Sequence, residues 1–216
     1  MPAHPAATPH VEFVFQRPGL PVPVYLLSIY DDAELDIYQG QEVAEPTPGS
    51  TIQPKPHPFM RSFNLSAATR ARIFKLARDL NYFNIACASK AKNIADTGTK
   101  TLSYSAPDAH GSCTYNYSEN KDVQALTELL QGITETMDEG RKLDYLHRYD
   151  RLGLDAEIAY LAQEVTAGRA LELGTIAESL RAIAADAEVM QRVRTRANSL
   201  LARLPDGSAQ AVPAQN

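Results

Sequence analysis

The sequence has no long hydrophobic run. None of its apolar stretches approaches the roughly 20 residues that a helix needs to span a bilayer, so we expect no transmembrane segment. The first ten residues, MPAHPAATPH, also lack the basic start and the apolar centre of a signal peptide. We predict that residues 1–9 are a flexible spacer behind a cleaved leader or a lipid anchor. The ragged start of a cytoplasmic protein is the alternative.

An excess of basic residues is also missing. The 216 residues include 21 Lys and Arg against 26 Asp and Glu, which gives a formal net charge of -5. No basic stripe of the kind that neutralises phosphates is present, so we expect no nucleic acid partner. With 44% hydrophobic and 22% charged residues, the chain has the composition of a globular protein that buries a core.

Only two cysteines occur, Cys87 and Cys113, 26 positions apart (113 minus 87). In an exported protein such a pair is most simply a disulfide, here between the loop after the first predicted helix and the last predicted strand. Buried free thiols are the second interpretation. A nucleophilic pair of Cys113 with His110, or a metal held by these three side chains, lacks the usual spacing and further partners. We therefore predict no metal and no cofactor.

Alternation of apolar and polar residues predicts the strands of an antiparallel sheet. The central stretch, residues 25–40, is expected to form a hairpin about its two adjacent aspartates. Further strands are predicted over residues 10–16 and 59–65. The proline-rich segment 45–58 joins the central hairpin to the strand over residues 59–65. It is expected to be a surface loop, and docking into an aromatic groove is the alternative.

Helical periodicity begins after Ser66, which we expect to cap an amphipathic helix over residues 67–80. A meander of strands and such a helix each have one face to bury, so this helix should cover the sheet. Residues 99–105 and 112–118 then alternate again, on either side of the turn residues 106–111. This pattern predicts a second hairpin.

This order of elements resembles a family of small bacterial domains of unknown function that are usually found behind export signals. The matching segments are YLLSIYDDAELDIYQG, FNLSAATRARIFKLARDLNYFN, and ADTGTKTLSYS followed by TYNYSENKDVQALTELL. The resemblance covers residues 10–135 and implies an exported α+β domain. The family tends to have Asp-Gly at the first hairpin turn, where this chain has Asp32 and Ala33. The resemblance transfers no catalytic residue.

The rest of the chain is rich in alanine and in helical stripes. Asp122 is expected to cap a helix that either continues across Gly140 or breaks there. Further helices are predicted from their capping residues, which are Asp155, Asp186, and Thr175 with Glu178. Residues 136–204 should form a helical domain or extension, and residues 205–216 a disordered tail. The predicted fold is α+β, an antiparallel sheet covered by a helix and followed by a C-terminal α-helical bundle.

Residues 95–99, Ala-Asp-Thr-Gly-Thr, contain the active-site tetrapeptide of aspartic proteases, enzymes in which two such aspartates share one proton. Asp96 alone cannot do this chemistry. The chain has no second such motif, and residues 92–95 make a poor strand before it. A hydrolase that uses Asp96, or Cys113 with His110, is the alternative function.

Two further sets of side chains are candidates for binding. The carboxylates of Asp31, Asp32, Glu34 and Asp36 are enough for calcium but lack the spacing of an EF-hand loop. Because Glu34 and Asp36 alternate with apolar neighbours, we expect them on the solvent face of the first hairpin.

Three tyrosines, Tyr104, Tyr115 and Tyr117, are predicted on adjacent strands. They form either a platform that stacks a peptide or a sugar, or the rim of a core beneath a helix. No nucleophile, base and oxyanion donor can be assembled from the sequence. The sequence therefore predicts a non-enzymatic, exported binding or protein-interaction module, periplasmic or extracellular, with a protein, peptide or glycan as its ligand.

Overall fold

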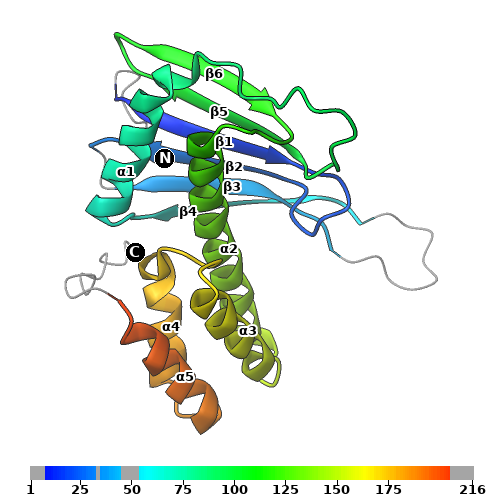
Figure 1. Ribbon diagram of the computed structural model, residues 1–216. Coiled ribbons are helices and arrows are strands. Elements are labelled where there is room, and N and C mark those ends of the chain that lie inside the picture. Colours follow the sequence, from blue (N-terminus) through cyan, green and yellow to red (C-terminus); the bar gives the residue numbers. More distant parts are fainter. Residues whose placement is uncertain (1–7, 33–34, 45–53, 205–216) are drawn as a thin grey trace. The chain divides into compact units, whose positions relative to one another are not determined.

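The computed structural model describes residues 8–32, 35–44 and 54–204 (Figure 1). These residues form a six-stranded antiparallel sheet and five α-helices, which confirms the predicted α+β fold. The chain divides into two compact units, residues 1–130 and 131–216, which we call the sheet unit and the helical unit. The division falls after residue 130, five residues before the predicted boundary (135 minus 130), and both positions lie inside one long helix.

Several predictions fall partly or wholly outside the described residues. They concern the N-terminal spacer up to residue 7, Ala33 and Glu34 at the first hairpin turn, residues 45–53 of the proline-rich segment, and the tail 205–216.

The strands lie in the order β4-β3-β2-β1-β5-β6, and each neighbouring pair is antiparallel. They are β1 (His10–Gln16), β2 (Val24–Tyr30), β3 (Asp36–Glu42), β4 (His57–Phe63), β5 (Thr99–Ser105) and β6 (His110–Tyr115). The predicted central hairpin is β2 paired with β3, in which Leu27 lies opposite Tyr38. β4 covers residues 57–63 instead of the predicted 59–65, so it includes the end of the proline-rich segment.

The second hairpin is present with a different boundary. β6 begins at His110 rather than at Ser112, because the turn that joins it to β5 needs only residues 106–109. The strand ends at Tyr115. Tyr117 therefore lies outside the sheet, contrary to prediction.

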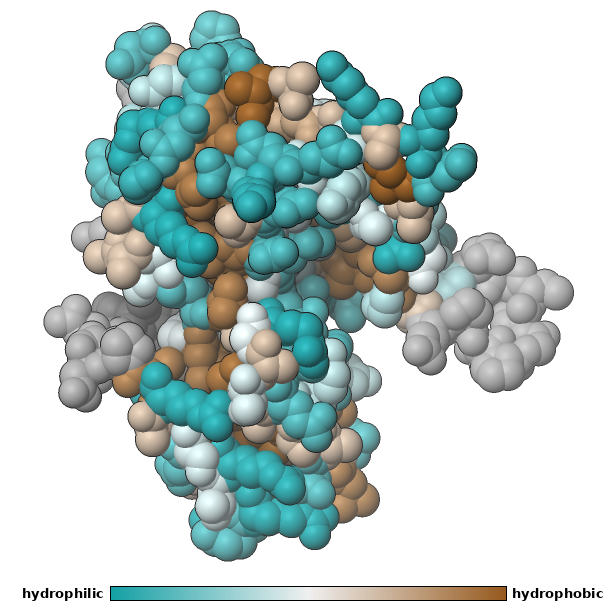
Figure 2. All heavy atoms as spheres, viewed as in Figure 1, coloured by the Kyte–Doolittle hydropathy of each residue, from teal (hydrophilic) through white to brown (hydrophobic). Residues whose placement is uncertain are grey.

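Helix α1 (Ala67–Asp79) covers one face of the sheet (Figure 1). Ser66 caps it as predicted, since its Oγ accepts a hydrogen bond from Thr69 N at 3.2 Å. Figure 2 shows hydrophilic residues over the outer side of α1 and a band of hydrophobic residues beside it, toward the sheet. Burial of this apolar surface stabilises the unit by about 25 cal/mol per Å². The residues with the least exposure here are Ile73, Phe74 and Ala77 of α1 and Val11, Phe13, Leu27, Ile29 and Leu102 of the sheet.

Helix α2 (Lys121–Tyr149) is continuous, so the possible break at Gly140 does not occur. Gly132 and Gly140 are positions of close approach within the helical unit. A Cβ on Gly132 would lie 2.8 Å from the Leu171 side chain, and one on Gly140 would lie 2.3 Å from Ile176. The two glycines admit these apolar side chains against the helix without ending it.

The helical unit also contains α3 (Leu154–Thr166), η2 (Leu173–Ile176), α4 (Ala177–Ala185) and α5 (Gln191–Leu201), and the sheet unit contains the short turn η1 (Asn81–Phe83). Within the described ranges, no helix is both long enough and apolar enough to cross a membrane.

Four predicted helix caps are wrong. Asn120 caps α2 instead of Asp122, because its Oδ1 accepts a hydrogen bond from the Asp122 N–H at 2.9 Å. The residues that precede α3, α4 and α5 make no capping hydrogen bond through a side chain. Asp155 and Asp186 form ion pairs instead, and the Thr175 hydroxyl has no hydrogen-bond partner among the described residues. Arginines distant in the sequence bind Asp155 and Asp186, and Asp186 also accepts a local hydrogen bond from Glu188 N at 2.9 Å.

Candidate binding site

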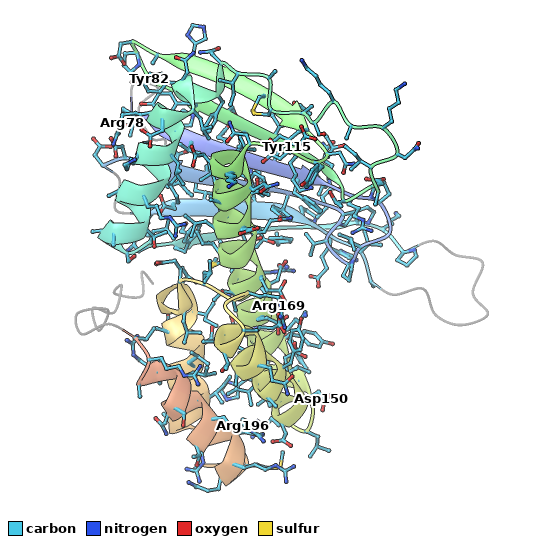
Figure 3. All side chains as sticks on the ribbon, viewed as in Figure 1. Arg78, Tyr82, Tyr115, Asp150, Arg169 and Arg196 are labelled. Atoms are coloured by element: carbon cyan, nitrogen blue, oxygen red, sulfur yellow. A yellow bond between two sulfur atoms is a disulfide. The ribbon has the colours of Figure 1, made fainter. Side chains whose placement is uncertain are left out.

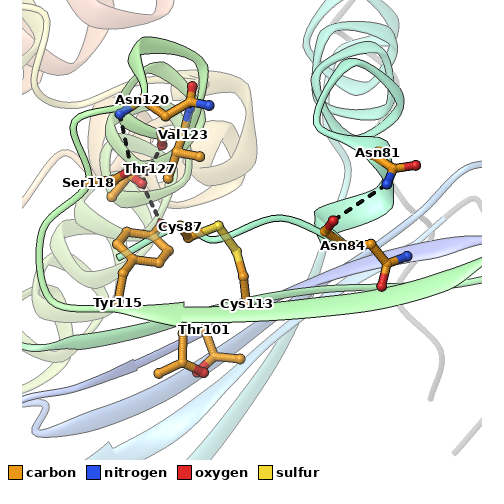
Figure 4. Close-up of a disulfide and its surroundings, with 11 residues drawn as sticks. Asn81, Asn84, Cys87, Thr101, Cys113, Tyr115, Ser118, Asn120, Val123 and Thr127 are labelled. Carbon is orange, nitrogen blue, oxygen red and sulfur yellow. Dashed lines mark hydrogen bonds between the residues drawn. A yellow bond between two sulfur atoms is a disulfide. The ribbon is translucent and has the colours of Figure 1, made fainter. Parts of the chain in front are cut away.

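Cys87 and Cys113 form a disulfide, with their Cα atoms 5.8 Å apart (Figure 4). It ties the segment after η1 to β6, as the sequence predicted. Because the Cys113 sulfur is bonded to Cys87, it offers no thiolate for a nucleophilic pair with His110. In the described part of the chain, no three His, Cys, Asp or Glu side chains are arranged to hold a metal ion.

Asp96 shapes a turn. Its carboxylate accepts a hydrogen bond from Gly98 N at 2.9 Å, and among the described residues this is its only hydrogen bond, so no second acid shares a proton with it. The turn surrounds Lys100, whose Nζ donates to the carbonyl oxygens of Thr97, Gly98 and Asn116 at 3.2, 3.0 and 2.9 Å. Burial lowers the pKa of Lys100. The protease-like motif therefore builds a cradle for a buried ammonium group.

Asp36 is fully buried, which contradicts its predicted place on the solvent face of the hairpin. Its two oxygens accept hydrogen bonds from the two terminal nitrogens of Arg70, both at 2.8 Å, and one also accepts from Tyr30 N at 3.0 Å. Burial raises the pKa of Asp36, and Arg70 opposes that shift. Asp36 therefore holds α1 on the sheet, and its oxygens accept hydrogen bonds instead of binding calcium.

The three tyrosines of the predicted platform lie in different surroundings. Tyr115 is 4% exposed, and its hydroxyl donates to Thr127 Oγ1 at 2.6 Å, because that oxygen in turn donates to Val123 O (Figure 4). Burial raises the pKa of Tyr115 to about 12. Tyr117 is 43% exposed, and Tyr104 is half-buried. One shared platform is therefore not formed.

Tyr104 packs instead against Tyr82, a residue that sequence reasoning did not select. The two ring centroids are 4.8 Å apart, and the ring planes are tilted by 42°. Phe74 of α1 meets Tyr104 edge-on, with the centroids 6.3 Å apart. Both tyrosines are half-buried, so each keeps part of its surface accessible to a ligand.

An unusual backbone conformation holds Tyr82. The φ angles of Asn81, Tyr82 and Phe83 are 50°, 53° and 67°. Asparagine tolerates this left-handed region, whereas a bulky side chain there costs about 1–2 kcal/mol per residue. Phe83 is fully buried, which offsets part of the cost. Tyr82 gains less from burial because it stays half-exposed.

Contacts with β6 fix this turn. Asn84 Nδ2 donates a hydrogen bond to His110 O at 2.8 Å. Gly111 lies against the turn so closely that a Cβ on it would be 2.2 Å from Tyr82 O. The disulfide anchors the chain again at Cys87. Tyr82 is therefore held in place by side-chain, backbone and covalent contacts.

Charged groups surround the two rings. Arg78, in the last turn of α1 (Figure 3), is exposed and forms no ion pair within the described residues. Burial raises the pKa of Tyr104, and Tyr82, Asp31 and Asp108 add to the shift, whereas the charge of Arg78 acts on Tyr104 in the opposite direction. The Tyr104 hydroxyl therefore stays protonated at neutral pH and can donate a hydrogen bond. We call Arg78, Tyr82 and Tyr104 the Tyr82 site.

Sequence reasoning found Tyr104 and missed Tyr82. A left-handed backbone is usually marked by glycine, and a tyrosine in that conformation leaves no signal in composition or periodicity. One indication of a turn here was present in the sequence. Tyr82 is the second residue after the end of the predicted helix, and chain reversals are common at helix ends.

Comparison with known proteins finds no family model that matches the chain and no curated protein that matches it. The resemblance of residues 10–135 to an exported domain family therefore stays a prediction.

Proposed function

We propose that the protein is a non-enzymatic binding module of an oxidising compartment, periplasmic or extracellular, and that it binds a segment of a partner protein at the Tyr82 site. The proposal includes membership of the exported domain family that residues 10–135 resemble. One observation carries it. A strained left-handed turn presents Tyr82 beside Tyr104, and strain of this kind clusters at functional sites.

The chemistry of the Tyr82 site favours a protein segment. Tyrosine and arginine are enriched in the energetic centres of protein–protein interfaces, because each offers a large flat surface together with hydrogen-bonding atoms. Arg78 has no acidic partner in the described part of the chain, so its guanidinium is available to a carboxylate. We infer an extended segment with an apolar side chain against the two rings and an acidic side chain at Arg78.

The disulfide supports the proposed location. Disulfides form and persist in oxidising compartments and are rare in the cytosol, where thiols are kept reduced. The bond between Cys87 and Cys113 joins residues of the same unit as the Tyr82 site, so an oxidising environment also maintains the segment that carries Tyr82.

A selection of displayed random peptides on the intact, oxidised protein tests the site. We expect enriched peptides to lose affinity about 30-fold or more in Tyr82→Gly, the effect of losing a contact worth about 2 kcal/mol at an interface centre. Glycine is chosen because it adopts the left-handed backbone without strain, so the turn and the fold are retained. Affinities would be measured by calorimetry, and folding by circular dichroism.

Tyr117→Ala is the matched control, because Tyr117 is an exposed tyrosine of the same unit that lies outside the Tyr82 site. It should leave the affinity unchanged. Peptides that bind Tyr82→Gly as tightly as the unmodified protein would contradict the proposal. Binding of neutral oligosaccharides that is lost in Tyr82→Gly, without any peptide binding, would assign the site to glycans instead.

A further inference from the structure

A carboxyl group is fully buried in the helical unit. Glu139 of α2 has 0% exposure, and its Oε1 accepts a hydrogen bond from Lys142 Nζ at 2.5 Å. Its other oxygen, Oε2, has no hydrogen-bond donor among the described residues. An ionised carboxylate with an unsatisfied oxygen is costly to bury, because water no longer solvates its charge.

A second carboxyl group faces the same ammonium. Lys142 Nζ is 3.5 Å from Glu157 Oε1, so one cation of α2 serves an acid on α2 and an acid on α3. In the described part of the chain, no other cation contacts either acid. If both acids were ionised, two carboxylates would face one ammonium, and the Glu139 charge would be buried although the Lys142 and Glu157 side chains are 50% and 23% exposed.

The other groups around Glu139 do not supply the missing charge. Tyr160 of α3 donates from its hydroxyl to Glu135 Oε1 at 3.3 Å, and Lys142 Nζ lies 5.8 Å from the centre of the Tyr160 ring. Next to Glu139 along α2, Gly140 packs against the apolar side chain of Ile176. Glu135 is a further acid, so it adds to the negative potential at the cluster.

Protonation of Glu139 accounts for both the excess negative charge and the oxygen without a hydrogen-bond donor. On Glu139 Oε2 the proton would remove the extra negative charge and would turn the unsatisfied oxygen into a donor to Glu157. Burial first, and then the hydrogen bond with Glu157, raise the pKa of Glu139 to about 8, although Lys142 acts in the opposite direction. Geometry and electrostatics therefore agree on a protonated Glu139 at neutral pH.

We propose that Glu139 and Glu157 share one proton, held on Glu139, and that this pair is a pH-sensitive latch between α2 and α3. The latch is closed while Glu139 donates to Glu157. When the proton leaves to water, two carboxylates face one ammonium, and their repulsion loosens the contact between α2 and α3.

The direction of the pH effect follows from linkage. The pKa of Glu139 in the folded protein lies above its ordinary value of 4.5, so the folded state holds the proton over the interval up to about pH 8. The stability that the latch contributes is full below pH 4.5 and is lost as the pH rises through about 8. Within that interval the unfolding equilibrium constant rises by at most about tenfold per pH unit for one proton.

The glutamine variant Glu139→Gln tests the latch, because a neutral amide can donate to Glu157 and accept from Lys142 at every pH. Urea unfolding of the intact protein and of the variant would be followed by circular dichroism between pH 5 and 9. We expect the ratio of the two unfolding constants, unmodified over variant, to rise at least tenfold from pH 5 to pH 8. A ratio that stays constant over this range would overturn the proposal.

Glu164→Gln is the matched control on α3. Arg169 binds Glu164 and holds its pKa below the ordinary range, so Glu164 is ionised throughout the interval tested. The ratio of the two unfolding constants, unmodified protein over Glu164→Gln, should stay constant between pH 6 and 9. If Glu139→Gln does not fold, the ¹³C shift of the Glu139 carboxyl carbon in the unmodified protein decides. Titration above pH 7 supports the latch, and titration between pH 4 and 5 overturns it.

Discussion

Replacement of Asp36 by alanine is expected to destabilise the sheet unit by about 3–5 kcal/mol, because it leaves a buried guanidinium without its partner. The Arg70 side chain is 14% exposed, and Asp36 is fully buried. Both terminal nitrogens of Arg70 bind Asp36, so the variant loses two charge-assisted hydrogen bonds between α1 and β3. Urea unfolding followed by circular dichroism measures the loss.

Two further variants separate the buried pair from a generic charge effect. Asp79→Ala removes one partner of the exposed pair between Lys75 and Asp79 and should cost less than about 1 kcal/mol. The double variant Asp36→Ala with Arg70→Leu should recover part of the stability, because no buried charge is then left uncompensated. If Asp36→Ala costs no more than Asp79→Ala, the pair does not anchor α1.

Reduction of the disulfide is expected to cost about 2–4 kcal/mol of unfolding free energy, on the entropy of opening a loop of this length. The double variant Cys87→Ser with Cys113→Ser should lose the same amount in the absence of reductant. Without the disulfide, the segment that follows the left-handed turn is no longer anchored to β6. The affinity of any ligand of the Tyr82 site should therefore fall. Unfolding curves with and without reductant measure the first effect, and calorimetry measures the second.

A count of reactive thiols on denatured, unreduced protein is the control for this experiment. Protein purified from an oxidising compartment should show no reactive thiol. Two reactive thiols would mean that Cys87 and Cys113 are not bridged, and they would contradict both the expected cost of reduction and the proposed location.

Elements governed by local patterns could be predicted from the sequence. The alternation in residues 10–16 and 25–40 places β1, β2 and β3 because one face of each strand must be apolar to form a core. Ser66 caps α1 because its partner, Thr69 N, is three residues away. The two cysteines could be paired because they were the only candidates.

Features that depend on distant partners could not be predicted in the same way. Asp36 stands between apolar residues, and it lies on the core face of β3 because Tyr38 on the same face is buried and because Arg70 on α1 binds the carboxylate. Likewise Asp155, which had the sequence signal of a cap, is bound by arginines of α5. Pattern reasoning assigns a polar side chain to solvent or to a local backbone group unless its partner is known.

The candidate site shows the same limit. Tyr104 was found because it lies in a strand with regular alternation. Tyr82 was missed because its position depends on a left-handed backbone that β6 holds through Gly111 and His110. The partners of the turn lie more than 20 residues further along the chain, and no short-range rule connects them.

A chemical-shift map of the ¹⁵N-labelled protein, saturated with a peptide from the selection, shows directly whether peptides bind at the Tyr82 site. We expect the largest amide shifts in residues 78–84 and 104–111, and unchanged amide shifts in α4 and α5. Shifts that gather on another surface, with residues 78–84 unaffected, would contradict the claim that Tyr82 and Tyr104 form the binding site.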